Sequence, residues 1–76
     1  MSGKRIPFSL QVFRSEESKD PMVKIEVLYE SRLKGYVDQE KQRYVKTRGV
    51  ILRCFLGERK LWGVITNSRE WTEEID

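Results

Sequence analysis

Residues 50–66 read VILRCFLGERKLWGVIT and are the stretch that decides the fold. Two runs rich in β-branched and aromatic residues flank the four-residue segment Gly57–Lys60, which contains a glycine. This arrangement is the sequence signature of a β-hairpin. Both runs are apolar on both faces except at Arg53 and Gly63, as is typical of strands inside a sheet. We therefore predict two central antiparallel strands here.

Two more strands are predicted upstream. Ile6–Val12 and Val23–Tyr29 each alternate apolar and polar residues, so every second side chain would face a core. Between them, Ser15–Pro21 has no apolar residue and ends in Asp-Pro, which indicates a connecting loop through which the two strands pair. Pro7 has no N–H to donate. The first strand is therefore expected at a sheet edge, or with Pro7 on its free side.

The segment from Glu30 to Gly49 admits two interpretations. In the first it holds a helix capped by Asp38, with basic residues in the last turn and Gly49 just beyond the end. In the second it is a hairpin with a turn over 38–42. We favour the hairpin, because residues 39–43 offer no apolar side chain to dock on a core and the residues that follow prefer strands.

Gly49 marks a predicted irregularity. The inward residue before it would be Val45, whereas the inward residues after it begin at Val50 and continue with the opposite parity. A β-bulge corrects such a shift, and glycine suits the positive φ that many bulges require.

The C-terminal segment predicts a short helix. Asn67 and Ser68 are potential caps, with Glu70 placed as in a capping box. Trp71 and Ile75 stand four residues apart, so a helix would lay both on the sheet.

Together these features predict a single small, mainly β domain over residues 1–76, with ends at 1–5 and 73–76 that fray. We expect an SH3- or OB-like half-open barrel, or a curved antiparallel sheet of four to five strands, with a short C-terminal helix. An α+β fold with a helix near 38–48 is the alternative. A chain of 76 residues buries a small core, so oligomerisation or docking would stabilise it.

The composition argues against catalysis. The chain has no histidine, the commonest general base and metal ligand, and its single cysteine, Cys54, cannot form an internal disulfide or a zinc site. It has no phosphate-binding glycine loop. We expect no catalytic residue, no metal and no cofactor, in a protein that resides in a reducing compartment. No apolar run approaches a membrane span and no signal peptide is visible, so we expect a cytoplasmic protein without membrane contact.

Positive charge is concentrated in the middle of the sequence. The net charge is +3, but residues 31–60 carry nine basic and three acidic side chains, a balance of +6, which leaves −3 elsewhere. Basic residues interleaved with aromatic ones suit a nucleic acid, because cations neutralise phosphates and aromatic rings stack on bases. We therefore predict a non-enzymatic accessory protein that binds DNA or RNA. The predicted binding residues are Arg43, Tyr44, Lys46, Arg48, Arg53, Arg59 and Lys60.

The alternative function is a small protein-binding module, an inhibitor or adaptor that docks on a larger partner. Tryptophan is a frequent interface anchor, and Trp71 stands in an acidic C-terminal segment with Glu70 and Glu74. The basic middle and the acidic end could also meet in a homodimer, assisted by exposed strand edges.

Overall fold

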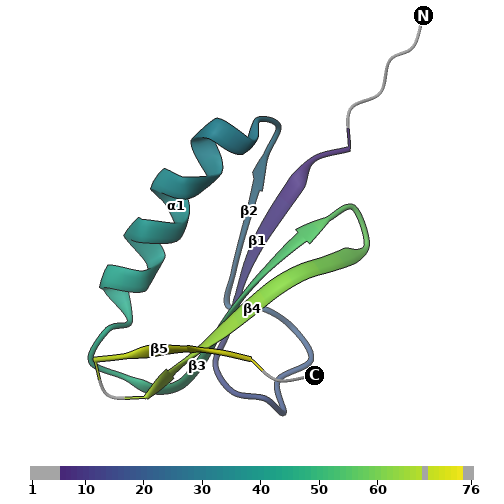
Figure 1. Ribbon diagram of the computed structural model, residues 1–76. Helices are drawn as coiled ribbons and strands as arrows, with labels where there is room; N and C mark the ends of the chain where they lie inside the picture. The colour runs from purple at the N-terminus through teal and green to yellow at the C-terminus, as the bar shows by residue number, and fades with distance from the viewer. Residues whose placement is uncertain (1–5, 68, 75–76) are drawn as a thin grey trace, which may run out of the picture.

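Five antiparallel strands form one open sheet, and a single helix packs on one of its faces (Figure 1). The computed structural model describes residues 6–67 and 69–74. The elements in chain order are β1 (Phe8–Phe13), β2 (Val23–Val27), α1 (Glu30–Arg43), β3 (Arg48–Leu56), β4 (Arg59–Asn67) and β5 (Trp71–Glu73). The strand order is β2-β1-β3-β4-β5. The prediction of a mainly β chain with a small antiparallel sheet is confirmed, and the sheet leaves β2 and β5 as edges.

The hairpin over residues 50–66 is confirmed as β3 and β4, both inside the sheet. Leu56 pairs with Arg59, so the turn itself is only Gly57 and Glu58. Gly57 has φ +64°, a left-handed conformation that glycine adopts without steric cost. The bulge expected at Gly49 is also confirmed, since the register shifts between Arg48 and Ile51 and Gly49 has φ +77°.

β1 and β2 pair as predicted, with Leu10 opposite Ile25. The expectation that β1 lies at an edge is wrong, because β3 pairs with its other side. Pro7 does not prevent this, since β1 begins only at Phe8. The Pro7 carbonyl instead accepts a hydrogen bond from the Gly57 N–H at 3.2 Å.

The hairpin interpretation of residues 30–49 is wrong, and this segment holds α1. The helix begins at Glu30, well before the expected cap at Asp38, and Tyr29 is its N-cap residue. Its buried stripe is Leu33, Val37 and Glu40, so both apolar anchors lie before the expected cap at Asp38. β2 and β3 run parallel on either side of β1, and such a pair requires a long crossover connection, which α1 provides. Within the described residues α1 is the only helix, and it falls short of a membrane span.

The expected C-terminal helix is replaced by β5. Trp71 lies opposite Thr66 and Glu73 lies opposite Val64, so the segment extends the sheet along the free side of β4. Pairing with β4 satisfies the backbone groups on one side of this segment and still places Trp71 against the core. The predicted cap Ser68 and the residue Ile75 lie outside the described residues, as do the predicted frayed ends 1–5 and 75–76. Glu73, also expected to fray, is part of β5.

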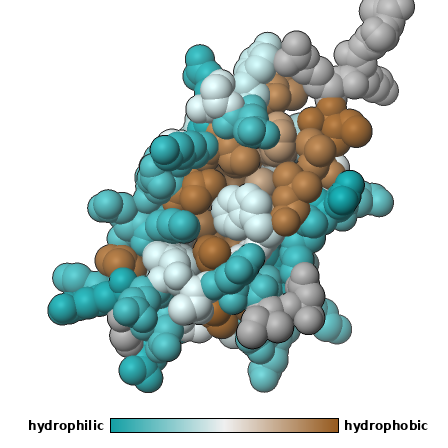
Figure 2. Space-filling view, in the orientation of Figure 1, coloured by the Kyte–Doolittle hydropathy of each residue, from teal (hydrophilic) through white to brown (hydrophobic). Residues whose placement is uncertain are grey.

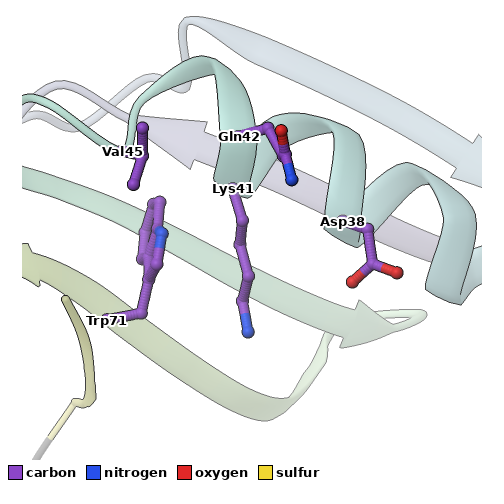
Figure 3. Close-up of a pocket in the computed structure, with 5 residues that line it drawn as sticks. All are labelled: Asp38, Lys41, Gln42, Val45 and Trp71. Carbon is purple, nitrogen blue, oxygen red and sulfur yellow. The ribbon is translucent and has the colours of Figure 1, made fainter. Parts of the chain in front are cut away.

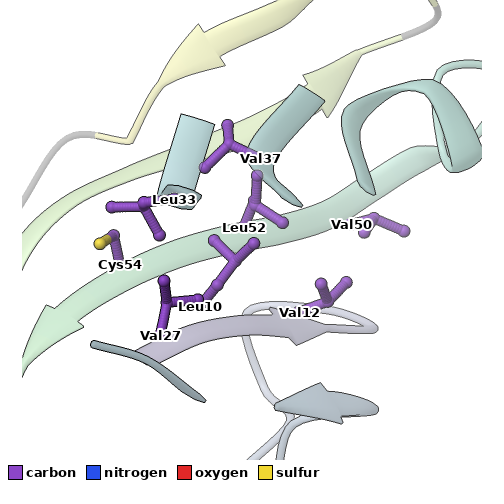
Figure 4. Close-up of a cluster of buried hydrophobic side chains, with 8 residues drawn as sticks. All are labelled: Leu10, Val12, Val27, Leu33, Val37, Val50, Leu52 and Cys54. Carbon is purple, nitrogen blue, oxygen red and sulfur yellow. The ribbon is translucent and has the colours of Figure 1, made fainter. Parts of the chain in front are cut away.

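The core lies between α1 and the central strands (Figure 4). Leu10 and Leu52, from neighbouring strands, are fully buried beneath Leu33 and Val37 of the helix. The buried cluster comprises Leu10, Val12, Val27, Leu33, Val37, Val50, Leu52 and Cys54.

Candidate nucleic-acid interface

The seven predicted nucleic-acid-binding residues do not share one surface. Arg43, Tyr44, Lys46 and Arg48 lie where α1 ends and β3 begins, whereas Arg59 lies at the far end of β3, opposite Leu56. At about 3.3 Å per residue, the length of β3 separates these two places by roughly 26 Å. The length of β3 causes this division, because it holds the two groups at opposite ends of the strand.

Arg53 and Lys60, two of the predicted binding residues, are engaged by Glu74. Arg53 lies on the sheet face away from α1 and donates two hydrogen bonds to the Glu74 carboxylate, Nε to Oε1 at 3.0 Å and Nη2 to Oε2 at 2.6 Å. Its guanidinium also lies 4.8 Å from the centre of the Phe13 ring. Lys60 Nζ lies 3.5 Å from Glu74 Oε1. Hydrogen bonding from Arg53 lowers the pKa of Glu74 below its ordinary value, although partial burial opposes this.

Gly63 provides the space for this ion pair. Gly63 lies opposite Arg53 in the β3–β4 ladder. A Cβ placed on it would collide with the Glu74 carboxylate and lie 3.3 Å from Arg53 Cγ. The pair therefore passes over β4 at the one position where that strand has no side chain.

Tyr44 also contributes to the fold, because it is half-buried and packs against the core cluster. Part of its ring is therefore covered by the core. Trp71 of β5 is a second half-buried aromatic residue at this end of the sheet.

The fold gathers a compact set of cations around the end of α1, which we call the basic end. Three predicted residues and Lys41 belong to it, and the chain reversal after β4 adds Arg69, whose N–H donates to the Val45 carbonyl at 2.8 Å. Arg69 has φ +73°, in a tight turn closed by the Asn67 N–H bond to the Glu70 carbonyl at 2.9 Å. The members of the basic end are Lys41, Arg43, Lys46, Arg48 and Arg69.

The acidic residues near the basic end differ in exposure. Glu40 is only 1% exposed, and its Oε1 lies 3.6 Å from Arg43 Nη1. Glu70 is exposed, beside Arg69 in sequence. The five cations of the basic end thus outnumber Glu40, Glu70 and the exposed Asp38. No local pattern predicts the place of Arg69, because this residue lies far along the chain from residues 41–48.

A cavity of about 430 Å³ adjoins the basic end. One wall is a helical stripe in which Asp38, Lys41 and Gln42 are followed by Val45, and the other wall is Trp71 of β5 (Figure 3). Figure 3 shows the indole beside Val45, with the Lys41 side chain next to it. The Trp71 Nε1 is buried and has no hydrogen-bond partner among the described residues.

The lining of this cavity combines an aromatic ring, an amide, a carboxylate and an ammonium group. An aromatic face can stack on a nucleobase, and the polar groups supply both donors and acceptors for its edge. Trp71 was predicted as an anchor for a protein partner. Its place beside Lys41 puts it next to the basic end, to which Lys41 belongs.

A second, apolar groove lies between the first half of α1 and the sheet, with a volume of about 530 Å³. Figure 2 shows apolar side chains gathered between the helix and the β3–β4 hairpin. The helix packs over β1 and β2 and leaves this side of β4 partly open. The residues lining the groove are Phe8, Glu30, Leu33, Lys34, Val37, Leu61 and Trp62.

The cysteine offers little reactivity. Cys54 is fully buried, and burial raises the pKa of its thiol, with a smaller contribution from the negative charge of Glu30. The neutral thiol is a poor nucleophile. Within residues 6–67 and 69–74, no three histidine, cysteine, aspartate or glutamate side chains are grouped so that they could hold a metal ion.

No protein-family model, curated protein sequence or solved structure matches this chain. The candidate interface is thus defined by its own geometry. It consists of the basic end and the Trp71 cavity, which have Lys41 in common and meet at Val45.

Proposed function

We propose that this chain is a non-enzymatic accessory protein that binds single-stranded DNA or RNA. The observation that carries the proposal is that two residues distant in sequence, Arg69 and Trp71, lie beside the cations of residues 41–48. Phosphates bind along the basic end, and an unpaired base enters the cavity and stacks on Trp71. A paired base cannot enter, so a single strand binds more tightly than a duplex.

The charge of the basic end sets the expected salt dependence. Each phosphate contact on a single strand releases counterions and contributes about −0.7 to the slope of log K against log salt concentration. Five cations therefore give a slope of about −3.5 at most. Stacking of one base on Trp71 adds roughly 1–3 kcal/mol that depends little on salt.

The test is fluorescence anisotropy of labelled single-stranded and duplex oligonucleotides at two salt concentrations. The triple variant Arg43→Ala, Lys46→Ala, Arg48→Ala should weaken binding and flatten the slope by about two. The matched control is Arg14→Ala, Lys19→Ala, Arg59→Ala, which removes the same charge from exposed positions elsewhere. Equal losses in the two triple variants would mean that binding is nonspecific charge attraction, and would contradict the proposal.

Trp71 is tested separately. Trp71→Leu should weaken single-strand binding by about tenfold or more while leaving the salt slope unchanged, because it removes stacking and not charge. Trp71→Phe keeps an aromatic face and should retain most of the affinity. Circular dichroism and urea unfolding of both variants establish that the fold is intact. Equal affinity of the Leu and Phe variants would exclude a stacking role for this residue.

The protein-binding alternative stays a prediction. Of its three residues, Trp71 packs against the core and Glu74 forms the ion pair with Arg53, while Glu70 is exposed. Two of the three thus have roles within the chain, and we place the functional surface at the basic end.

A further inference from the structure

β2 is an edge strand whose sequence is complementary to itself. Within the described residues, β1 pairs with one side of β2 and no strand pairs with the other. The strand and its two neighbours read MVKIEVL over residues 22–28. If a second copy paired antiparallel to it with Ile25 at the centre, each residue would oppose the partner residue at the mirror position of this stretch.

The charges match in that register. Lys24 would lie opposite Glu26 of the partner subunit, and Glu26 opposite the partner's Lys24, so the symmetric pair contains two opposite-charge contacts. Both side chains are exposed on the sheet face away from α1. Within the chain they oppose only the uncharged Gln11 and Ser9. Their charges therefore have no cross-strand partner in β1.

The apolar residues match as well. Val23 would oppose Val27 of the partner subunit, and the two copies of Ile25 would face each other beside the core. Val23 and Ile25 are only half-buried in the single chain. At the two ends of the stretch, Met22 is 40% exposed and Leu28 is 54% exposed. These two would also lie opposite one another.

The geometry points to a homodimer formed through β2, in which the two five-stranded sheets join across a two-fold axis at Ile25. An unpaired strand edge is a template for such pairing, and a two-fold interface requires the self-complementary pattern that this stretch has. This surface differs from the one suggested by overall charge, which set the basic middle against the acidic end. It also lies at the opposite edge of the sheet from β5 and Trp71.

The first test is sedimentation equilibrium of the full chain over protein concentrations from micromolar to millimolar. The natural sequence should dimerise reversibly. Lys24→Glu replaces two attractive contacts by two repulsive ones and should raise the dimer dissociation constant about tenfold or more. The double variant Lys24→Glu, Glu26→Lys restores opposite charges in the same register and should recover dimerisation.

The second test fixes the register. Ile25→Cys should form a disulfide-linked dimer under mild oxidation, because residues facing each other across an antiparallel pair lie within disulfide reach. Val23→Cys is the control and should not cross-link to itself, since it faces Val27 of the partner subunit. The natural Cys54 is fully buried and should not interfere.

Three results would overturn the proposal. They are a monomer at every concentration, a dimer as tight in Lys24→Glu as in the natural sequence, and a charge-swapped double variant that does not regain the dimer. Cross-linking of Val23→Cys as efficiently as Ile25→Cys would exclude this register. Unfolding curves establish that each variant is folded, which is expected because Lys24 and Glu26 are exposed.

Discussion

Glu74, the residue directly after β5, links that strand to β3 and β4. Its carboxylate accepts two hydrogen bonds from Arg53 on β3 and lies 3.5 Å from Lys60 on β4. Its backbone N–H donates to the Gly63 carbonyl at 2.8 Å. The side chain of Glu74 is only 11% exposed, so solvent screens the ion pair with Arg53 less than it screens a surface pair. These contacts with β3 and β4 hold the end of β5 against the sheet.

We predict that Glu74→Gln lowers the free energy of unfolding at pH 7 by about 1–2 kcal/mol, because a charged hydrogen-bonded acceptor is lost. The pKa of Glu74 is lower in the folded chain than its ordinary value of 4.5. The carboxylate therefore stabilises the fold above that pH, and this stabilisation is lost as the pH falls through the lowered pKa. Urea unfolding at pH 7 and at pH 3 should show the gap between variant and natural protein narrowing in acid. A gap independent of pH would show that the charge is not responsible.

Two glycines in adjacent elements, α1 and β3, differ in backbone conformation. Gly35 is exposed inside α1, and a Cβ there would meet nothing within 4 Å. Gly49 also has open space around it, but its φ of +77° forms the bulge at the start of β3. The two positions therefore differ in backbone conformation and not in the space available for a side chain.

We predict that Gly35→Ala raises the free energy of unfolding by about 0.5–1 kcal/mol, since alanine loses less entropy in a helix. Gly49→Ala should lower it by about 1–2 kcal/mol, the cost of a left-handed conformation for a residue with a Cβ. Gly49→Asn should cost less than Gly49→Ala, because asparagine tolerates that conformation. Thermal unfolding of the three variants measures all the differences. Equal effects at positions 35 and 49 would contradict this account.

The molecule places its two proposed surfaces at opposite edges of one sheet. The dimer edge is β2, whereas Trp71 and the basic end lie at the β5 side. The core cluster between them spans all the central strands and the helix. A domain this small has one such core and is expected to unfold as a single unit.

Cys54 reports on that cooperativity. It lies in β3, is fully buried, and has a thiol pKa raised by burial. We predict that a disulfide reagent at pH 8 labels the thiol only as fast as the whole chain unfolds, and at once in denaturant. Destabilising variants such as Gly49→Ala should accelerate labelling, because they raise the population of unfolded chain in which the thiol is exposed. Rapid labelling of the stable natural protein would show that β3 opens locally.

Much of the sheet follows from the sequence because its signals are local. The β3–β4 hairpin, the bulge at Gly49 and the pairing of β1 with β2 all depend on alternation and turn chemistry within a few residues. The absence of histidine and the basic charge of residues 31–60 follow directly from the composition. These features do not depend on what lies elsewhere in the chain.

The tertiary structure alone decided the rest. Residues 30–43 became a helix because β2 and β3 flank β1, and only a crossover can join them. Residues 71–73 became a strand because β4 offered a free edge. The Arg53–Glu74 pair and the meeting of Arg69 and Trp71 with the end of α1 join residues about 20 or more positions apart. Such contacts depend on the path of the whole chain, which local pattern does not specify.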